Sequence, residues 1–339
     1  MEANMCKILI CFGTRPEFIK LEPLIKKMEG VIEYKTLFTG QHVDLVRHEP
    51  DYRIEIQDGG NRLDSIVSSV MNGIDFNGIT AVIVQGDTTS AYAVALSAFH
   101  HQIPVIHLEA GLRTYNLEQP YPEEANRQMI SRIASIHLCP TKLAKELLVQ
   151  ENVSGNIQVV GNTVLDNLVG IKPSNKNQVL VTMHRRENHK NIEKWFSQID
   201  KLSRQYTNYE FLLPIHPNPA VKKFSSLLKS VTVVEPMAYD DLITYLSQCS
   251  FVVTDSGGIQ EEAAFFRKPC LVCREETERK EGLDNFSLLC ERPELLSQRF
   301  EALKPLQMHG PCPYGDGKAS EKIIEILTNC FLQLKENVG

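Results

Sequence analysis

The stretch FVVTDSGGIQEEAAFF, residues 251–266, contains a complete strand–turn–helix unit of the kind that builds an α/β sheet. FVVT predicts a buried strand, residues 255–258 predict a tight turn, and the residues that follow predict a helix. The stretch KILICFGTRPEFIK, residues 7–20, has the same order, with Pro16 at a favoured first helical position. Because parallel strands are joined by such crossover helices, the repeated unit indicates a parallel sheet.

Short apolar runs alternate with longer amphipathic runs along the rest of the chain. We expect strands at residues 7–12, 34–39, 81–85, 104–109, 136–139, 157–160, 178–183, 210–215, 231–234, 251–254 and 269–273. We expect helices at residues 16–28, 90–100, 123–134, 142–150, 192–206, 259–266 and 321–334. Most strand runs are continuously apolar, which is typical of parallel strands covered by helices on both faces. The pattern predicts a doubly wound α/β protein.

The polar stretch GIKPSNKNQ, residues 170–178, divides this pattern into two similar halves. We therefore expect an N-terminal Rossmann-like domain over residues 1–170 and a C-terminal one over residues 171–339. The terminal helix, residues 318–335, is expected to cross back to the N-terminal domain. Two such domains facing a central cleft would open their strand-to-helix loops into it, and most unusual polar clusters of the sequence lie on such loops.

Composition narrows the class of protein. The 339 residues are 42% hydrophobic and 23% charged, as in an ordinary globular protein. A net charge of −6 argues against nonspecific nucleic-acid binding, so we expect no nucleic-acid partner. The N-terminal segment has only a short apolar run, residues 8–12, and no run approaches the roughly 20 residues of a membrane span. We therefore expect neither a signal peptide nor a membrane partner.

The nine cysteines are odd in number, and several lie in apolar strand-like runs. Cys270 and Cys273 have CxxC spacing, but they lie within a strand pattern and no second pair accompanies them. Buried, reduced thiols in a cytoplasmic protein are the preferred interpretation over a metal or redox pair.

The turn at residues 255–258 has the features of an anion site. Unpaired N–H groups, the positive end of a helix dipole and glycines that allow close approach would receive a phosphate at Ser256, Gly257 and Gly258. The alternative is a serine N-cap with glycines for a tight turn. A dinucleotide fingerprint is absent, and GPCPYGDGKAS has Asp316 where a Walker loop needs lysine, so a hydride-transfer enzyme becomes a weak hypothesis.

Three further residues point to a nucleotide diphosphate. Glu262 follows one turn into the helix, where its carboxylate would accept hydrogen bonds from a ribose diol. Arg15 and Lys20 flank the corresponding turn of the N-terminal half and suit a diphosphate, the arginine as a planar fork and the lysine as a point charge. For Lys20 a solvated helix face is the alternative.

Acidic residues follow consecutive strands and a helix start of the N-terminal half. Asp87, Glu109 and Glu123 should converge at one sheet edge and perform paired acid/base chemistry on a neutral, sugar-like group. Taken singly, Asp87 is a candidate helix N-cap and Glu123 a candidate partner of a helix dipole. Arg113 and Arg127 are the expected counter-ions that keep the acids from repelling one another.

Histidines end two strands of the C-terminal half. His184 precedes two arginines in HRREN, and His216 lies in HPNP. HxH and HxxH spacings are absent from both motifs, so we expect no metal site. The neighbouring arginines should keep His184 neutral until an anion arrives, after which it is suited to pair with a departing phosphate.

A series of motifs, in this order, closely resembles the non-hydrolysing UDP-N-acetylglucosamine 2-epimerases over residues 7–325. The motifs are GTRPEFIK, TGQH, GDTTS, HLEAGLRT, PYPEEANR, GNTVLD, HRREN, HPNP, DSGGIQEEA and ETERKEG. The resemblance implies a glycosyltransferase-B fold, a cytoplasmic homodimer without a cofactor, and the production of UDP-N-acetylmannosamine for surface polysaccharides. It also implies the route: anti-elimination of UDP to 2-acetamidoglucal, followed by re-addition.

The resemblance assigns roles residue by residue. Residues that would hold UDP are Arg15, Lys20, His184, Ser256, Gly257, Gly258, Glu262 and Arg279. Residues that would act on the sugar are Asp87, Glu109 and Glu123 as acid/base carboxylates, with His184 at the departing phosphate. Residues matching a second, activating UDP-N-acetylglucosamine site are Gln41, Arg185 and His216.

The sequence departs from the family pattern at several positions. Lys280 stands where proline is usual, Gln85 where histidine is common and Phe18 where alanine is usual, and the chain is shorter than most members. A related UDP-2-acetamido-6-deoxy-hexose is therefore an alternative substrate. A hydrolysing epimerase that releases UDP and N-acetylmannosamine, a glycosyltransferase of the same fold, and a nucleotide-sugar sensor are alternative functions.

Overall fold

The computed structural model describes residues 7–42, 49–57 and 59–336. The chain forms two compact units: Met1–Asn167 together with Gly317–Gly339, and Leu168–Asp316. The chain thus leaves the first unit once and returns to it for its last helix.

The first unit is built on a seven-stranded parallel sheet with the order β3-β2-β1-β4-β5-β6-β7. Its strands are β1 (Lys7–Phe12), β2 (Glu33–Phe38), β3 (Tyr52–Arg53), β4 (Ala81–Gln85), β5 (Val105–Leu108), β6 (Ile136–Cys139) and β7 (Asn156–Val159). Its helices are α1 (Arg15–Met28), α2 (Arg62–Gly73), α3 (Thr89–His100), α4 (Glu123–Ile133), α5 (Lys142–Gln150) and α11 (Ala319–Glu336).

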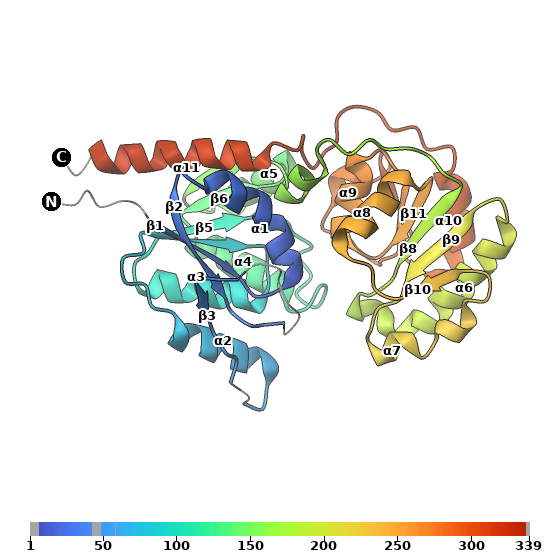
Figure 1. Ribbon diagram of the computed structural model, residues 1–339, viewed down its shortest axis with the longest axis horizontal. Helices are drawn as coiled ribbons and strands as arrows, with labels where there is room; N and C mark the ends of the chain where they lie inside the picture. The colour runs from blue at the N-terminus through green and yellow to red at the C-terminus, as the bar shows by residue number, and fades with distance from the viewer. Residues whose placement is uncertain (1–6, 43–48, 58, 337–339) are drawn as a thin grey trace. The chain divides into compact units, whose positions relative to one another are not determined.

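Alternation along the apolar strands gives this sheet two buried faces. Ile10 of β1 packs in one cluster with Leu21 of α1 and Ile323 of α11. The neighbouring Leu9 packs in another cluster with Val94 of α3. Figure 1 shows α11 beside α1 on one side of the sheet and α3 on the other. The terminal helix is thus part of the first unit's core.

The second unit is built on a six-stranded parallel sheet with the order β10-β9-β8-β11-β12-β13. Its strands are β8 (Gln178–Thr182), β9 (Glu210–Pro214), β10 (Thr232–Val234), β11 (Phe251–Thr254), β12 (Cys270–Val272) and β13 (Ser287–Leu289). Its helices are α6 (Ile192–Gln205), α7 (Pro219–Lys222), α8 (Tyr239–Gln248), α9 (Gly257–Phe265) and α10 (Leu296–Leu303).

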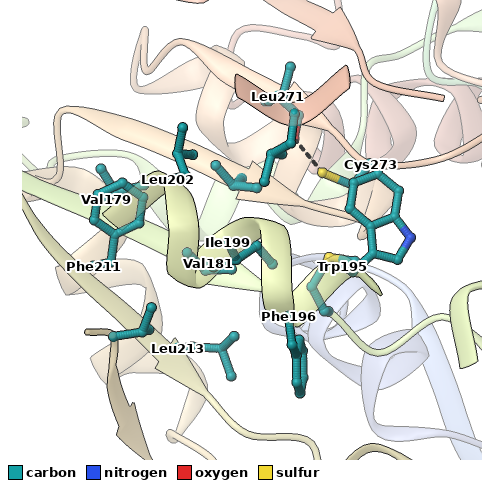
Figure 2. Packing of buried hydrophobic residues seen from close by; sticks show 14 of the residues in the cluster. Val179, Val181, Trp195, Phe196, Ile199, Leu202, Phe211, Leu213, Leu271 and Cys273 are labelled. Atoms are coloured by element: carbon teal, nitrogen blue, oxygen red, sulfur yellow. Dashed lines mark hydrogen bonds between the residues drawn. The ribbon is translucent and has the colours of Figure 1, made fainter. Parts of the chain in front are cut away.

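One core cluster of the second unit lies between one face of the sheet and the helices α6 and α10. Trp195 and Phe196 of α6 pack in one cluster with Val181 of β8 and Leu213 of β9, as Figure 2 shows. The indole Nε1 of Trp195 donates to Asn188 Oδ1 at 3.2 Å, so the buried polar atom of this side chain is satisfied. Burying large apolar side chains here anchors α6 immediately after the HRREN segment.

Both sheets reverse their strand order once. In the first sheet β1 lies between β2 and β4, and in the second β8 lies between β9 and β11. Open α/β sheets bind ligands outside the carboxyl ends of their strands at such switch points. The loops concerned are residues 13–14 and 86–88 of the first unit and residues 183–185 and 255–256 of the second, each followed by the first turn of a helix.

Every expected strand and helix is confirmed to within two residues at each end. The cysteines that the structure describes are free thiols, and six of them are buried; Cys6 lies outside the described residues. Burial raises the pKa of Cys270 and Cys273, so both act as small neutral side chains. No helix in the described part of the chain has both the length and the hydropathy of a membrane span.

Candidate active site

The turn between β1 and α1 presents Arg15 at the switch point of the first unit. Thr14 caps α1 through its side-chain oxygen, and Arg15, the first helical residue, is exposed. A Cβ on Gly13 would lie 2.5 Å from Ser90 Oγ and would also meet Thr39 Oγ1. Glycine at this position therefore allows the first turn of α3 to lie directly against the loop.

Lys20 and Glu109 form an ion pair in this unit. Lys20 Nζ donates to Glu109 Oε2, and Gln85 Nε2 donates to the same oxygen. The side chains of Lys20 and Glu109 are only 16% and 7% exposed. The alternative that Lys20 lies on a solvated helix face is therefore wrong.

Glu109 also has an unusual backbone. Its φ of 59° lies in the left-handed region, which side chains with a Cβ rarely adopt. Such a conformation costs about 1–3 kcal/mol and persists where the surrounding structure enforces it, frequently at functional sites. The residue follows the last residue of β5, Leu108, at the edge of the sheet where ligands of this architecture bind.

Asp87 and the preceding Gly86 are held by two elements, α4 and β5. Arg127 of α4 pairs with its carboxylate, and Asn126 Nδ2 donates to its backbone oxygen at 2.9 Å. His107 of β5 hydrogen-bonds to the oxygen of the preceding Gly86 at 2.7 Å. The N-cap of α3 is Thr88, whose Oγ1 accepts from the helix, so the N-cap alternative for Asp87 is wrong and its carboxylate points instead to Arg127.

Glu123 is the half-buried first residue of α4. Its neighbour Glu124 stabilises this helix start. Glu124 is buried and accepts from the backbone N–H of Thr114 at 3.0 Å. The expectation for Arg113 is wrong: its guanidinium binds Glu151 through two hydrogen bonds of 2.8 and 3.0 Å. Of the two expected counter-ions, Arg127 therefore pairs with an acid of the cluster. Arg113 instead links its own loop to the C-terminal end of α5.

In the second unit, buried Asp255 connects the two loops of the switch point. Its carboxylate accepts from the backbone N–H of His184 at 3.0 Å and of Arg185 at 2.9 Å. It also accepts from Asn188 Nδ2 at 3.0 Å. The HRREN segment is thus fixed against the residues that precede the glycine turn.

Two histidines lie together beside Asp255. The rings of His184 and His216 are stacked, with centroids 6.0 Å apart and planes 19° apart, and His184 Nδ1 lies 3.4 Å from Asp255 Oδ1. Burial lowers the pKa of His184 and the Arg185 guanidinium lowers it further, while Asp255 opposes both. The prediction that His184 resists protonation is confirmed in direction, with burial as the larger cause.

The glycine turn is built against Arg279. Ser256 caps α9 through its Oγ, and Gly257 and Gly258 form the first helical residues. A Cβ on Gly257 would lie 2.6 Å from Arg279 Cζ, so the absence of a side chain lets the guanidinium lie over the helix start. Arg279 Nε donates to Glu261 at 2.7 Å and Nη1 to Glu278, which places a buried, paired cation beside the turn.

Glu262 lies on the same helix and is 3% exposed. Tyr239, the first residue of α8, donates its hydroxyl to Glu262 Oε1 at 2.8 Å. The hydroxyl fixes one carboxylate oxygen, which orients this side chain at the end of the sheet where the turn lies.

Comparison with known proteins places the chain in a family. The family model described as UDP-N-acetylglucosamine 2-epimerase matches residues 26–328. The chain belongs to the UDP-N-acetylglucosamine 2-epimerase family. It is similar to the UDP-N-acetylglucosamine 2-epimerase of Salmonella borreze, with 37% identity over 95% of this chain and 98% of that protein.

Solved structures of the epimerase family share its architecture. The chain is similar to UDP-GlcNAc 2-epimerase from Neisseria meningitidis bound to UDP-GlcNAc, with a TM-score of 0.86 and 34% identity over 95% of this chain and 100% of that one. It is also similar to S. aureus MnaA in a structure with UDP, with a TM-score of 0.88 and 33% identity over 97% and 98% of the two chains. The expected glycosyltransferase-B class, with two parallel α/β units, is confirmed.

Within each unit, the epimerase-family chain brings some of the expected residues together. In the first unit, Lys20 contacts Glu109 directly, and Arg15 and Asp87 follow the two strands at the switch point. In the second unit, His184 and Ser256 lie on loops joined through Asp255.

The residues expected at a second nucleotide site have different surroundings. Gln41 Oε1 accepts from the backbone and the hydroxyl of Ser90, at 3.0 and 2.8 Å, so it serves the first turn of α3. Arg185 Nε is buried without a hydrogen-bond partner among the described residues. His216 stacks on His184 and its Nδ1 accepts from the backbone of Asn218 at 3.2 Å.

Four residues that support the site were not predicted from the sequence. Gln85 contacts Glu109, His107 contacts Gly86 and Tyr239 contacts Glu262. The fourth is Glu17, which binds the turn at Gly13. Only Glu17 had a local signal, because Thr14-x-x-Glu17 is the spacing of a capping box. The other three act across long sequence separations, which local spacing does not reveal.

Proposed function

We propose that the protein interconverts UDP-N-acetylglucosamine and UDP-N-acetylmannosamine by inversion at C2, with UDP rejoined to the sugar at the end of each turnover. The observation that carries the proposal is the placement of Asp87 and Glu109. Each carboxylate follows a strand next to the switch point and is paired with one cation, Arg127 or Lys20. Carboxyl groups positioned in this way are suited to moving a proton on a neutral sugar.

Chemistry determines the order of the steps. The C2 proton has no adjacent carbonyl and is not acidic in the intact sugar, so direct abstraction would be prohibitively slow. When the C1–O bond breaks, C1 becomes oxocarbenium-like and the C2 proton becomes acidic. Loss of UDP and of that proton gives 2-acetamidoglucal. Protonation of C2 from the opposite face and return of UDP to C1 then give the epimer.

Each unit contributes to this sequence. Asp87, Glu109 and Glu123 remove and return the proton, and more than one acid is needed because the two faces of the ring are served separately. Lys20 neutralises Glu109 in the described state and turns toward the diphosphate when substrate binds, next to the exposed Arg15. Donors that are fixed in place at the departing oxygen each lower the barrier by about 3–4 kcal/mol in oxyanion sites.

The second unit binds the nucleotide. Ser256, Gly257 and Gly258 offer the N–H groups of a helix start, and Glu262 accepts from the ribose. His184, whose pKa burial lowers, lies on the loop joined to this turn through Asp255 and pairs with the departing diphosphate. Arg279 is buried and paired with Glu261 and Glu278, so it stabilises the turn by packing against the start of α9.

The proposal extends to assembly, location and regulation. The protein acts as a homodimer in the cytoplasm, without a cofactor, and a second UDP-GlcNAc activates it through Gln41, Arg185 and His216. Exposed apolar side chains on adjacent helices, Phe99 of α3 and Met129 of α4, offer a surface for self-association. Light scattering tests the dimer, and a sigmoidal dependence of initial rate on UDP-GlcNAc concentration tests the activation.

Incubation with UDP-GlcNAc in D₂O, followed by proton NMR, tests the reaction. We expect deuterium at C2 of both UDP-sugars with the linkage to UDP retained. Asp87→Asn and Glu109→Gln should lose turnover by orders of magnitude while UDP binding survives, whereas Glu146→Gln, at an exposed carboxylate of α5, should behave like the wild type. Release of free N-acetylmannosamine would identify a hydrolysing enzyme, and wild-type rates in the two site variants would contradict the assignment.

A further inference from the structure

Glu17 is a buried carboxylate that the proposed chemistry does not use. It lies in the first turn of α1 and is 5% exposed. Oε2 accepts from Gly13 N–H at 2.9 Å and from Thr14 Oγ1 at 2.8 Å. Oε1 accepts from Thr88 Oγ1, on the loop before α3, at 2.6 Å. One carboxylate therefore joins two loops that lie far apart in the sequence, since Glu17 and Thr88 are 71 positions apart.

The direction of these hydrogen bonds is fixed by the two helices. Thr14 Oγ1 caps α1 by accepting from Glu17 N–H at 3.4 Å, and Thr88 Oγ1 caps α3 by accepting from Ala91 N–H at 3.1 Å. A hydroxyl has one proton, and each of these points to Glu17 because the carboxylate accepts. Glu17 thus receives three donors, which is the arrangement that suits an ionised carboxylate.

The two loops carry residues of the proposed site. Arg15 directly follows one cap, Thr14, and Asp87 directly precedes the other, Thr88. We propose that Glu17 is a positioning residue for the epimerase reaction: by binding both cap hydroxyls, its carboxylate sets the loop of Asp87 relative to the loop of Arg15. This inference rests on the proposed function. Burial raises the pKa of Glu17, so the link is sensitive to any change that removes a donor.

Because the two carboxylate oxygens of Glu17 bind different loops, we expect a variant that breaks one contact to affect catalysis and UDP binding differently. Loss of the Thr88 contact releases the loop of Asp87 and leaves the Gly13 and Thr14 contacts beside Arg15 in place. Thr88→Val keeps the shape of the side chain and removes its hydroxyl, and with it both the link to Glu17 and the cap contact to Ala91 N–H. We expect kcat to fall about tenfold while the Kd for UDP stays within about twofold. Thr88→Ser retains the hydroxyl and should retain the wild-type kcat.

Glu17→Gln should act in the same direction as Thr88→Val but more weakly. The amide oxygen can satisfy Gly13 and Thr14, and the NH₂ group that then faces Thr88 can donate only a neutral hydrogen bond to its hydroxyl oxygen. We therefore expect a smaller fall in kcat, and the Glu17→Gln, Thr88→Val double variant should be no slower than Thr88→Val. Multiplied effects in the double variant, or a wild-type kcat in Thr88→Val, would overturn the proposal.

Amide hydrogen exchange provides a readout that does not require activity. If Glu17 orders both loops, Glu17→Gln accelerates exchange at residues 88–91 as well as near its own position. Acceleration confined to residues 13–20 would show that Glu17 only caps α1 and would refute the link. If Glu17→Gln accelerates amide exchange at residues 88–91 but the wild-type protein puts no deuterium at C2 of the sugar, the proposed function fails and the structural link stands.

Discussion

His107 makes the stability of the first unit dependent on pH. The imidazole lies in β5 with no exposed surface, and its Nε2 donates to the oxygen of Gly86, next to Asp87. Burial is the main cause that lowers the pKa of His107 from its usual 6.5 to about 3. The other ring nitrogen, Nδ1, has no hydrogen-bond partner among the described residues, so an added proton there would be buried without an acceptor.

The direction and the size of this change in stability follow from the linkage between folding and protonation of His107. Because the pKa is lowered in the folded state, the unfolded chain binds the proton first, and stability present in full above pH 6.5 is lost as the pH falls toward 3. The loss is about 2 kcal/mol at pH 5 and about 4 kcal/mol at pH 3. His137, the neighbour of His107 in the β5–β6 register, also has a pKa lowered by burial and acts in the same direction.

Urea unfolding at pH 8, 7, 6 and 5, followed by circular dichroism, measures this loss. His107→Gln keeps a donor for Gly86 and cannot titrate, so it should lose about 2 kcal/mol less than the wild type between pH 8 and pH 5. His100→Gln, at an exposed position near the end of α3, is the matched control and should follow the wild type. Parallel losses in the wild type and His107→Gln would refute the reasoning.

Three further outcomes are expected. Gly257→Ala places a Cβ 2.6 Å from Arg279 Cζ. Calorimetry should therefore show UDP affinity reduced at least tenfold, and thermal unfolding should show a loss of about 1–3 kcal/mol of stability. Gly258→Ala is the control and should lose far less stability, because its Cβ would meet nothing nearer than 3.9 Å. Tyr239→Phe removes the 2.8 Å hydrogen bond to Glu262 and should weaken UDP binding by about 1.5–3 kcal/mol in the same titration, with an unchanged affinity as the contrary result. EDTA should leave the initial rate of epimerisation unchanged, and inhibition that added metal reverses would contradict the cofactor-free proposal.

Most elements were predictable because their signals are local, although the helices Arg62–Gly73, Tyr239–Gln248 and Leu296–Leu303 were not among those expected. Continuous apolar runs such as Lys7–Phe12 and Gln178–Thr182 predict buried parallel strands wherever they lie in the chain. The two missed strands, Tyr52–Arg53 and Ser287–Leu289, are too short to show any periodicity. Pairing with a neighbouring strand, which a sequence pattern does not show, is what defines them.

The positions of the acids were predictable, but their partners were not. Asp87 and Glu109 follow strands, so topology alone sends them to one sheet edge. The pairing of Glu109 with Lys20 joins residues 89 positions apart. Arg113 seemed equally suited to the acid cluster, yet its backbone position directs it to Glu151. Choosing between nearby cations requires three-dimensional positions that charge and spacing do not supply.

Cleavage of the bond between C1 and the diphosphate oxygen is the central claim, and an oxygen isotope tests it most directly. UDP-GlcNAc carrying ¹⁸O in the bridge between C1 and the β-phosphorus is incubated with the protein and followed by ³¹P NMR. We predict that the label moves into the non-bridging positions of the β-phosphate while C2 inverts, because departed UDP can return through any of its terminal oxygens. If C2 inverts while the label stays entirely in the bridge, UDP never leaves the sugar and the account is wrong.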